Sequence, residues 1–260
     1  MVNFGLQNTP LKKHLIFIFL LIVFHLSAQA QIVPKDSIPN GFLFGLGVGV
    51  SQPEGILNDR FSTGGNLNFN AIYRAKNNFM FGLGAEQLFG NHLKDTSLFQ
   101  SLKNDQGVFI DNNGVPAAVI LTGTGFTLKG SIGKLFTFNE NKNTGLYCRL
   151  SLGFLQHKIK INVPDTKVPG LHDEYLKGYD HLTNGLYTSS FVGYMFLARD
   201  GRFNFSLGLD YGLGFTKNRR SWNFDSNSID NSSRLDHLLS IKLTYFFSLY
   251  LSDPEGDNYY

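Results

Sequence analysis

The stretch Arg202–Thr216, RFNFSLGLDYGLGFT, decides the fold because its side chains alternate over all fifteen residues. One parity is apolar or aromatic, and the other is small, polar or charged. Successive strand side chains point to opposite faces, so a period of two predicts a β-strand. The predicted strand is much longer than the roughly five or six residues that are typical of a strand in a globular sheet. The apolar parity comprises Phe203, Phe205, Leu207, Leu209, Tyr211, Leu213 and Phe215.

Two architectures fit such a strand. In a secreted β-sandwich the apolar face would form the core. In a membrane β-barrel the apolar face would contact lipid, and the polar face would line the interior. The rest of the chain distinguishes between them.

Composition and the N-terminus favour an exported β protein. The 260 residues include 28 glycines and 25 phenylalanines, and only 17% are charged, unlike a disordered chain. Lys12 and Lys13 precede the apolar run Leu15–Leu26, and small residues follow at Ala28 and Ala30. This pattern predicts a cleaved signal peptide at residues 1–30. The alternative, a retained membrane anchor, is disfavoured because the run is short for a bilayer.

Charge and cysteine content exclude further classes. Without residues 1–30 the chain has 21 basic and 20 acidic groups, a balance that argues against nucleic-acid binding. The single cysteine, Cys148, cannot form an intrachain disulfide and is interpreted as a small apolar side chain. No apolar run after the signal approaches a helical span. In a membrane the chain would therefore have to close into a barrel, since lipid cannot pair an open sheet edge.

The alternation predicts eight strands, and the parity of the sixth is left open. Asp111–Gly114, between the third and fourth strands, is expected to form the tip of a projecting hairpin. A segment at 31–40 and a tail at 252–260 would flank the barrel, which takes 41–251. The expected strands are 41–51, 65–75, 79–89, 125–138, 145–161, 186–198, 202–216 and 236–251.

Connection lengths indicate a membrane barrel. The links after strands two, four and six are short, whereas those after strands one, three, five and seven are long. Outer-membrane barrels have short periplasmic turns and longer extracellular loops. The predicted fold is an all-β, eight-stranded, antiparallel, up-and-down transmembrane β-barrel in the outer membrane, with both termini on the periplasmic side.

This pattern resembles the small outer-membrane barrels of the OmpA transmembrane-domain and OmpX type. The abundance of Phe, Tyr and Asn and the AQAQ end of the signal look most like the outer-membrane-barrel group of Bacteroidota. The resemblance covers roughly 41–251 and implies the barrel architecture and contact with outer-membrane lipid. Members of the family serve in adhesion, envelope tethering and secretion machines, and a few are lipid-modifying or proteolytic enzymes. For this chain we expect a non-enzymatic barrel, with other envelope proteins as candidate partners. The family offers no catalytic motif to carry over, and no cofactor is expected.

The inward parity suggests a charged layer inside the barrel. Counting from the short turns places Glu86, Lys129, Asp210 and Lys242 at one level, and Arg149 also faces inward. Buried charges need partners. An eight-stranded lumen is just filled by side chains, so we expect a layer of paired charges that plugs it. The alternative is a narrow ion path lined by the same residues.

The long loops contain further candidate residues. Arg219, Arg220 and Trp222 are candidates for contact with lipid headgroups, sugars or the membrane interface. In the third long loop, a group of acids and histidines has the residue types of a metal site. Its spacing matches no metal motif, so a solvated loop is favoured. The group comprises His172, Asp173, Glu174, Asp180 and His181.

A membrane-embedded hydrolase is the remaining alternative. His157 is expected to point inward near the loop end of the fifth strand, and it would need a nearby Ser or Asp. Ser189 is the candidate, although its strand has undetermined parity. The favoured function is a structural or interaction role in the cell envelope, through the long loops or by docking to a larger membrane complex.

Overall fold

The computed structural model of the chain describes residues 38–94, 97–138, 142–163, 168, 171, 175–198 and 203–251. The predicted signal peptide and the tail at 252–260 lie outside these residues, as does most of the segment 31–40. Within the described residues, no helix has both the length and the apolar character to cross a membrane.

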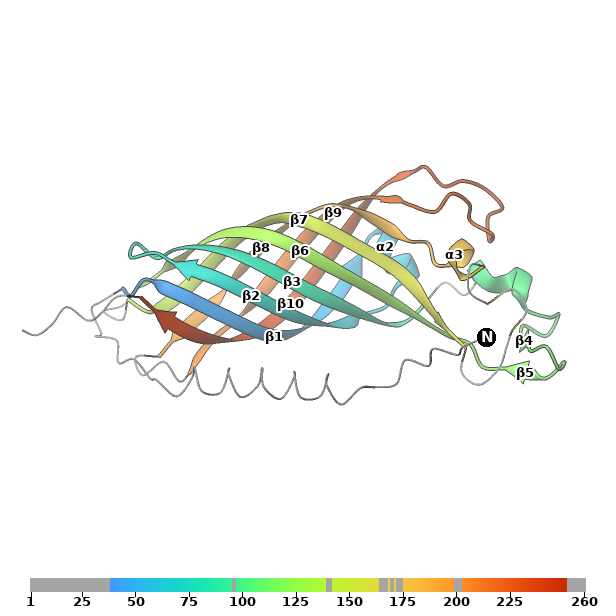
Figure 1. Cartoon of the computed structure of the whole chain (residues 1–260), viewed down its shortest axis with the longest axis horizontal. Coiled ribbons are helices and arrows are strands. Elements are labelled where there is room, and N and C mark those ends of the chain that lie inside the picture. Colours follow the sequence, from blue (N-terminus) through green and yellow to red (C-terminus); the bar gives the residue numbers. More distant parts are fainter. Residues whose placement is uncertain are drawn as a thin grey trace, which may run out of the picture.

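Eight long strands form a closed antiparallel barrel in the order β1-β10-β9-β8-β7-β6-β3-β2 (Figure 1). β1 pairs with β2 on one side and with β10 on the other, so the ring has no open edge. The predicted eight-stranded fold is confirmed. The strands are β1 Gly41–Glu54, β2 Gly64–Arg74, β3 Phe79–His92, β6 Ile120–Phe136, β7 Thr144–Asn162, β8 Thr183–Leu197, β9 Asn204–Asn218 and β10 Ser233–Tyr250.

Most strands continue further toward the long loops than their alternation predicted. β1 ends at Glu54 rather than at 51, and β6 begins at Ile120 rather than at 125. These extensions keep their ladder hydrogen bonds, since Ile120 of β6 still pairs with Asn162 of β7. The alternation of apolar and polar side chains weakens there because these strand ends extend beyond the apolar belt and no longer separate lipid from the lumen.

The structure settles the parity of β8. Tyr187, Ser189 and Phe191 are buried inside the barrel, whereas Val192 and Tyr194 are exposed on opposite parity. Both faces of this strand carry large apolar side chains near the short-turn end. The alternation of polarity that marks the other strands is therefore missing.

The connections differ at the two ends, as predicted. Links 75–78, 137–143 and 198–203 join strands at the end where Gly41 of β1 pairs with Tyr250 of β10. The four long links lie at the opposite end (Figure 1). They contain the helix α2 Ile56–Arg60, the 3₁₀ helix η1 Ser97–Leu102, the hairpin β4 Phe109–Ile110 with β5 Pro116–Ala117, and the helix α3 Leu176–Tyr179.

The expected hairpin tip is present between β4 and β5. Asp111 Oδ1 accepts hydrogen bonds from the backbone amides of Asn113 and Val115, both at 2.8 Å. Gly114 has a φ of 79°, a conformation that glycine adopts without a steric penalty.

Candidate functional site: a filled lumen and a folded cap

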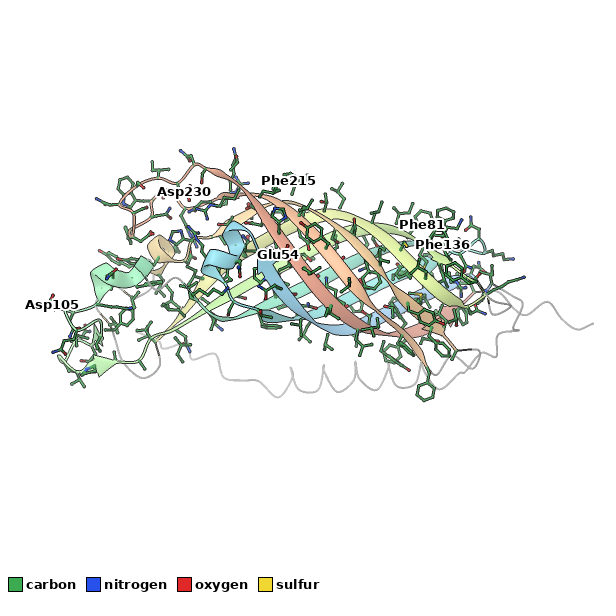
Figure 2. The ribbon with its side chains drawn as sticks, turned by 180° about the vertical axis from the view of Figure 1, so that it is seen from behind. Glu54, Phe81, Asp105, Phe136, Phe215 and Asp230 are labelled. Carbon is green, nitrogen blue, oxygen red and sulfur yellow. The ribbon has the colours of Figure 1, made fainter. Side chains whose placement is uncertain are left out.

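The outside of the barrel is a belt of exposed apolar side chains. Figure 2 shows Phe81 and Phe136 projecting outward near the short turns and Phe215 near the long loops. On β3, the outward-facing Phe79 and Phe89 are ten residues apart. With the usual rise and a tilt of about 40°, they are separated by about 25 Å along the barrel axis, the height of the apolar band in outer-membrane barrels.

The short-turn end of the lumen is filled by apolar side chains. They come from β1, β2, β3, β6, β7, β8 and β10, so they meet across the whole width of the barrel. Together they form a close-packed apolar layer across this end of the lumen. The layer comprises Leu43, Ile72, Met80, Leu135, Tyr147, Phe191, Met195, Leu197, Phe246 and Tyr250.

Arg74 is fully buried near the base of this layer and is held by the short turns. Its Nη1 donates to Asn143 Oδ1 at 2.8 Å, and its Nη2 donates to Asn78 Oδ1 at 2.6 Å. Nη2 also donates to the backbone carbonyl of Lys142 at 3.0 Å. No sequence pattern indicates this role of Arg74, because its partners lie in the turns, which have no regular period.

The middle of the lumen holds a quartet of two acids and two lysines. Lys129 Nζ lies 3.2 Å from Glu86 Oε2 and 3.4 Å from Asp210 Oδ2. Lys242 Nζ lies 2.8 Å from Glu86 Oε2 and also contacts Asp210 Oδ2. Each lysine thus bridges both carboxylates, and none of the four side chains is more than 4% exposed.

The quartet joins opposite walls of the barrel. Glu86 and Lys129 project from the adjacent strands β3 and β6, and Asp210 and Lys242 project from β9 and β10. Two strands separate these pairs in each direction around the ring. The structure therefore brings together the four charges placed at one level by counting along the sequence.

Arg149, the fifth inward charge, is not an ion-pair partner in the quartet. Its Nη1 donates to Asn70 Oδ1 at 3.3 Å, and its guanidinium carbon lies 5.0 Å from the centre of the Phe191 ring. Arg149 therefore lies where the charged quartet meets the apolar layer. A cation over an aromatic face retains part of its electrostatic stabilisation in a dry environment.

Toward the long loops, the lumen contains a buried polar cluster around His157. Its Nε2 lies 2.9 Å from Asp236 Oδ2, and Thr216 Oγ1 donates to the same oxygen at 2.6 Å. Sequence reasoning missed Asp236 because β7 and β10 are not neighbours in the ring. Ser189 is not paired with His157 by the strand register, which places it opposite Ser151 and six residues further along β8 than Thr183, the residue opposite His157.

The four long connections form a folded cap over this end of the barrel. Here "cap" denotes 55–63, 93–119, 163–182 and 219–232, so far as the structure describes them. Its apolar core includes residues of the first three connections and Ile159 at the end of β7. These are Leu57, Phe61, Leu93, Phe99, Phe109, Val168, Leu171 and Tyr179.

The fourth connection is fastened to the third. Phe224 packs edge-on against Tyr179, with 5.4 Å between the ring centres, and its amide donates to the Gly178 carbonyl. Arg220 Nε donates to Asp180 Oδ1 at 2.7 Å, and its Nη2 reaches the other carboxylate oxygen. Such two-point pairs fix geometry as well as adding energy.

These contacts place the loop residues predicted from sequence. Arg219 Nε donates to Asn184 Oδ1 at 2.6 Å, so Arg219 and Arg220 both join connections to each other or to the barrel. Trp222 is 42% exposed on the fourth connection. A surface role for these three residues stays a prediction, and the two arginines also have a structural role.

The acid and histidine group has no metal-like arrangement within the described residues. His172, Asp173 and Glu174 lie outside those residues, and Asp180 is paired with Arg220. His181 Nε2 lies 3.2 Å from Asp225 Oδ1. Burial lowers the pKa of His181 from its ordinary value, and the neighbouring Asp225 opposes this shift only in part.

A closed ring of eight antiparallel strands, with an apolar outer belt and a layer of paired charges inside, defines a transmembrane β-barrel. No protein-family model and no curated protein matches the chain. Among solved structures it is similar to Ail, the attachment invasion locus protein of Yersinia pestis (10% identity, 81% of this chain and 100% of that chain, TM-score 0.42). It is also similar to Neisserial surface protein A (10%, 79% and 96%, 0.40) and to OprG from Pseudomonas aeruginosa (11%, 83% and 100%, 0.41). Because these scores are low, the fold class rests on the strand order and the two faces of the barrel itself.

Replacing one lysine of the quartet should strongly destabilise the barrel. Lys242→Met leaves Glu86 and Asp210 with Lys129 alone, and breaking a buried ion pair costs about 3–5 kcal/mol. The free energy of unfolding in lipid vesicles, from urea titrations, measures this loss. Lys217→Met, at the exposed end of β9, is the matched control. A loss no larger than that of the control would contradict a stabilising quartet.

Acidification should loosen the cap through His181. Because folding lowers the pKa of this histidine, the loosened cap binds the proton more readily, and cap stability falls as the pH drops below about 6.5. Trp222, the only tryptophan, reports this change by fluorescence. His181→Gln should remove the pH dependence, and His237→Gln on the barrel wall should retain it. Equal responses from the two variants would exclude His181 as the cause.

Proposed function

We propose that this chain is a non-conducting outer-membrane barrel that holds a folded cap at the cell surface as a binding platform for other envelope components. The observation that carries the proposal is the contrast between its two ends. Two layers of side chains fill the lumen, whereas the first three long connections share an apolar core to which the fourth is attached. A molecule of this kind can present a surface but has little room to transport a solute.

The location follows from physical arguments. The apolar belt suits hydrocarbon, and the predicted signal peptide would direct export. Short turns are periplasmic in barrels of this class, so the cap would face outward. The Bacteroidota grouping stays a prediction.

The closed lumen favours a structural role over a pore. An ion entering from the cap would meet the paired quartet and then the apolar layer. The charges of the quartet are paired with each other, and the apolar layer has no charged groups to replace the ion's hydration shell. Passage of an ion would therefore require several side chains to move.

The cap favours protein or glycan contact over a purely structural role. Loops that only join strands need a few residues. These connections instead bury Phe99 completely and cross-link themselves through Arg220 and Asp180. A preorganised surface loses less entropy on binding. The alternative is that the outer wall of the barrel docks to a larger complex within the membrane.

Reconstituted protein should give no conductance steps in planar lipid bilayers. The sample must first be shown to come from the outer-membrane fraction and to shift on a detergent gel when boiled, as closed barrels do. Steps that occur in the wild type and disappear in Lys129→Met would instead establish an ion path through the quartet.

A photo-crosslinking residue at Asp105, on the cap, should trap a discrete envelope component in whole cells. Figure 2 shows Asp105 far from the barrel wall. Phe99→Ala should abolish this adduct because truncating a buried phenylalanine costs about 3–5 kcal/mol and would unfold the cap. The heat-dependent gel shift should remain, since Phe99 lies outside the barrel wall.

The same crosslinker at Phe136, near the short turns, is the positional control. If the adduct formed from Asp105 is unchanged by Phe99→Ala, the contact with the envelope component does not depend on the fold of the cap. Adducts only from Phe136 would favour docking through the outer wall.

A further inference from the structure

A pocket lies inside the barrel mouth, between the quartet and the cap. Its cavity volume is about 60 Å³, well below the roughly 300–1,000 Å³ of drug-sized ligand sites, so it suits a small or slender ligand. Its inner wall is formed by Leu88, Leu155 and Leu238, from β3, β7 and β10. Leu57 and Phe61, from the connection that contains α2, also line it (Figure 1).

Several glycines line this pocket. Three of the strands that line it carry glycine at inward positions, at Gly64, Gly90, Gly123 and Gly125. A Cβ at Gly123 would lie 2.5 Å from the Phe61 ring, so the ring packs directly on the backbone of the wall. The Phe61 ring thus occupies the place of a side chain at Gly123 and forms part of the pocket lining.

The wall is irregular beside the pocket. The register of β3 with β6 shifts between Phe89 and His92, and the pairing of β3 with β2 ends at Phe89. The pocket lining includes the outward-facing positions Gly65 and Phe89 as well as the inward-facing Leu88. The pocket therefore reaches the wall near the outer edge of the apolar belt, where lipid chains and headgroups meet.

One polar group of this pocket lacks a partner. His157 lines the pocket and is 9% exposed, and its Nδ1 has no hydrogen-bond partner among the described residues. The Asp236 carboxylate only accepts, so the 2.9 Å contact requires the hydrogen on Nε2. In the neutral ring Nδ1 is then an acceptor. An acceptor in this position is available to a hydrogen-bond donor on a molecule that enters the pocket.

We propose that this pocket binds one aliphatic chain bearing a hydroxyl group, with the chain against Leu155 and Leu238 and the hydroxyl donating to His157 Nδ1. An almost wholly apolar pocket with one acceptor fits such an amphiphile. The hydroxylated chain is either a free alcohol or part of a surrounding lipid. This inference goes beyond the proposed function, because it does not depend on what the cap binds.

The test is photolabelling of the full barrel in phosphatidylcholine vesicles. One arm adds a free medium-chain alcohol carrying a diazirine, and the other uses a phospholipid whose acyl chain carries both a hydroxyl and a diazirine. Mass spectrometry of the wild type should place adducts on Phe61, Leu88 or Leu155 in at least one arm. The arm that labels these residues identifies the source. Adducts confined to outward-facing residues such as Leu83 and Leu209 in both arms would overturn the proposal.

Filling the pocket should remove the labelling. Leu155→Phe and Leu238→Phe add bulk from different walls, and either should abolish the inner adducts while retaining the heat-dependent gel shift. Leu83→Phe, on the lipid-facing side, should leave them unchanged. Inner labelling that persists in a folded filling variant would also overturn the proposal.

The polar contact has its own test. The methyl ether of the same alcohol cannot donate a hydrogen bond, so it should compete roughly fivefold less well than the alcohol for the labelled site. Equal competition would show that His157 does not recognise the hydroxyl. The cap adduct at Asp105 should be unaffected by either filling variant, so the two proposals fail independently.

Discussion

Closure of the hydrogen-bonded ladder between β1 and β10 is the constraint on which the rest of the structure depends. Hydrocarbon offers no partner for a backbone amide or carbonyl, so a sheet in lipid must have no edge. The ladder runs from Gly41 opposite Tyr250 to Glu54 opposite His237. Once the ring is closed, every strand has one face toward lipid and one toward the lumen, which is why the chain alternates with a period of two.

A ring of eight strands leaves a lumen that side chains must fill. Long charged side chains can cross it only where the opposing wall is small. β1 supplies that space with Gly45, Gly47 and Gly49 on its inward face. The quartet extends across the middle of the lumen, and the apolar layer fills the end where the turns are tight. The filling of the middle and of the short-turn end of the lumen by the described side chains thus follows from the small size of the ring.

The features that could be predicted from the sequence are those that follow from the regular geometry of the strands. Glu86, Lys129, Asp210 and Lys242 could be placed at one level because each lies eight or nine residues from a short turn. The pair of His157 and Asp236 could not be predicted, because it joins strands separated by two others. The inward face of β8 was hidden by Phe191, Met195 and Leu197, which make it as apolar as the outer face.

The cap escaped prediction for a different reason: connections have no period. Residues such as Phe99 and Val168 are isolated apolar side chains in polar sequence, and only folding brings them together. They are buried by the hydrophobic effect of water, whereas the outward-facing residues of the barrel are stabilised by contact with lipid. The mouth pocket lies where these two solvents meet, with Phe61 packed on Gly123 between cap and wall. The pocket is almost wholly apolar, and His157 Nδ1 in its lining has no partner among the described residues, so binding of an amphiphile would account for both features.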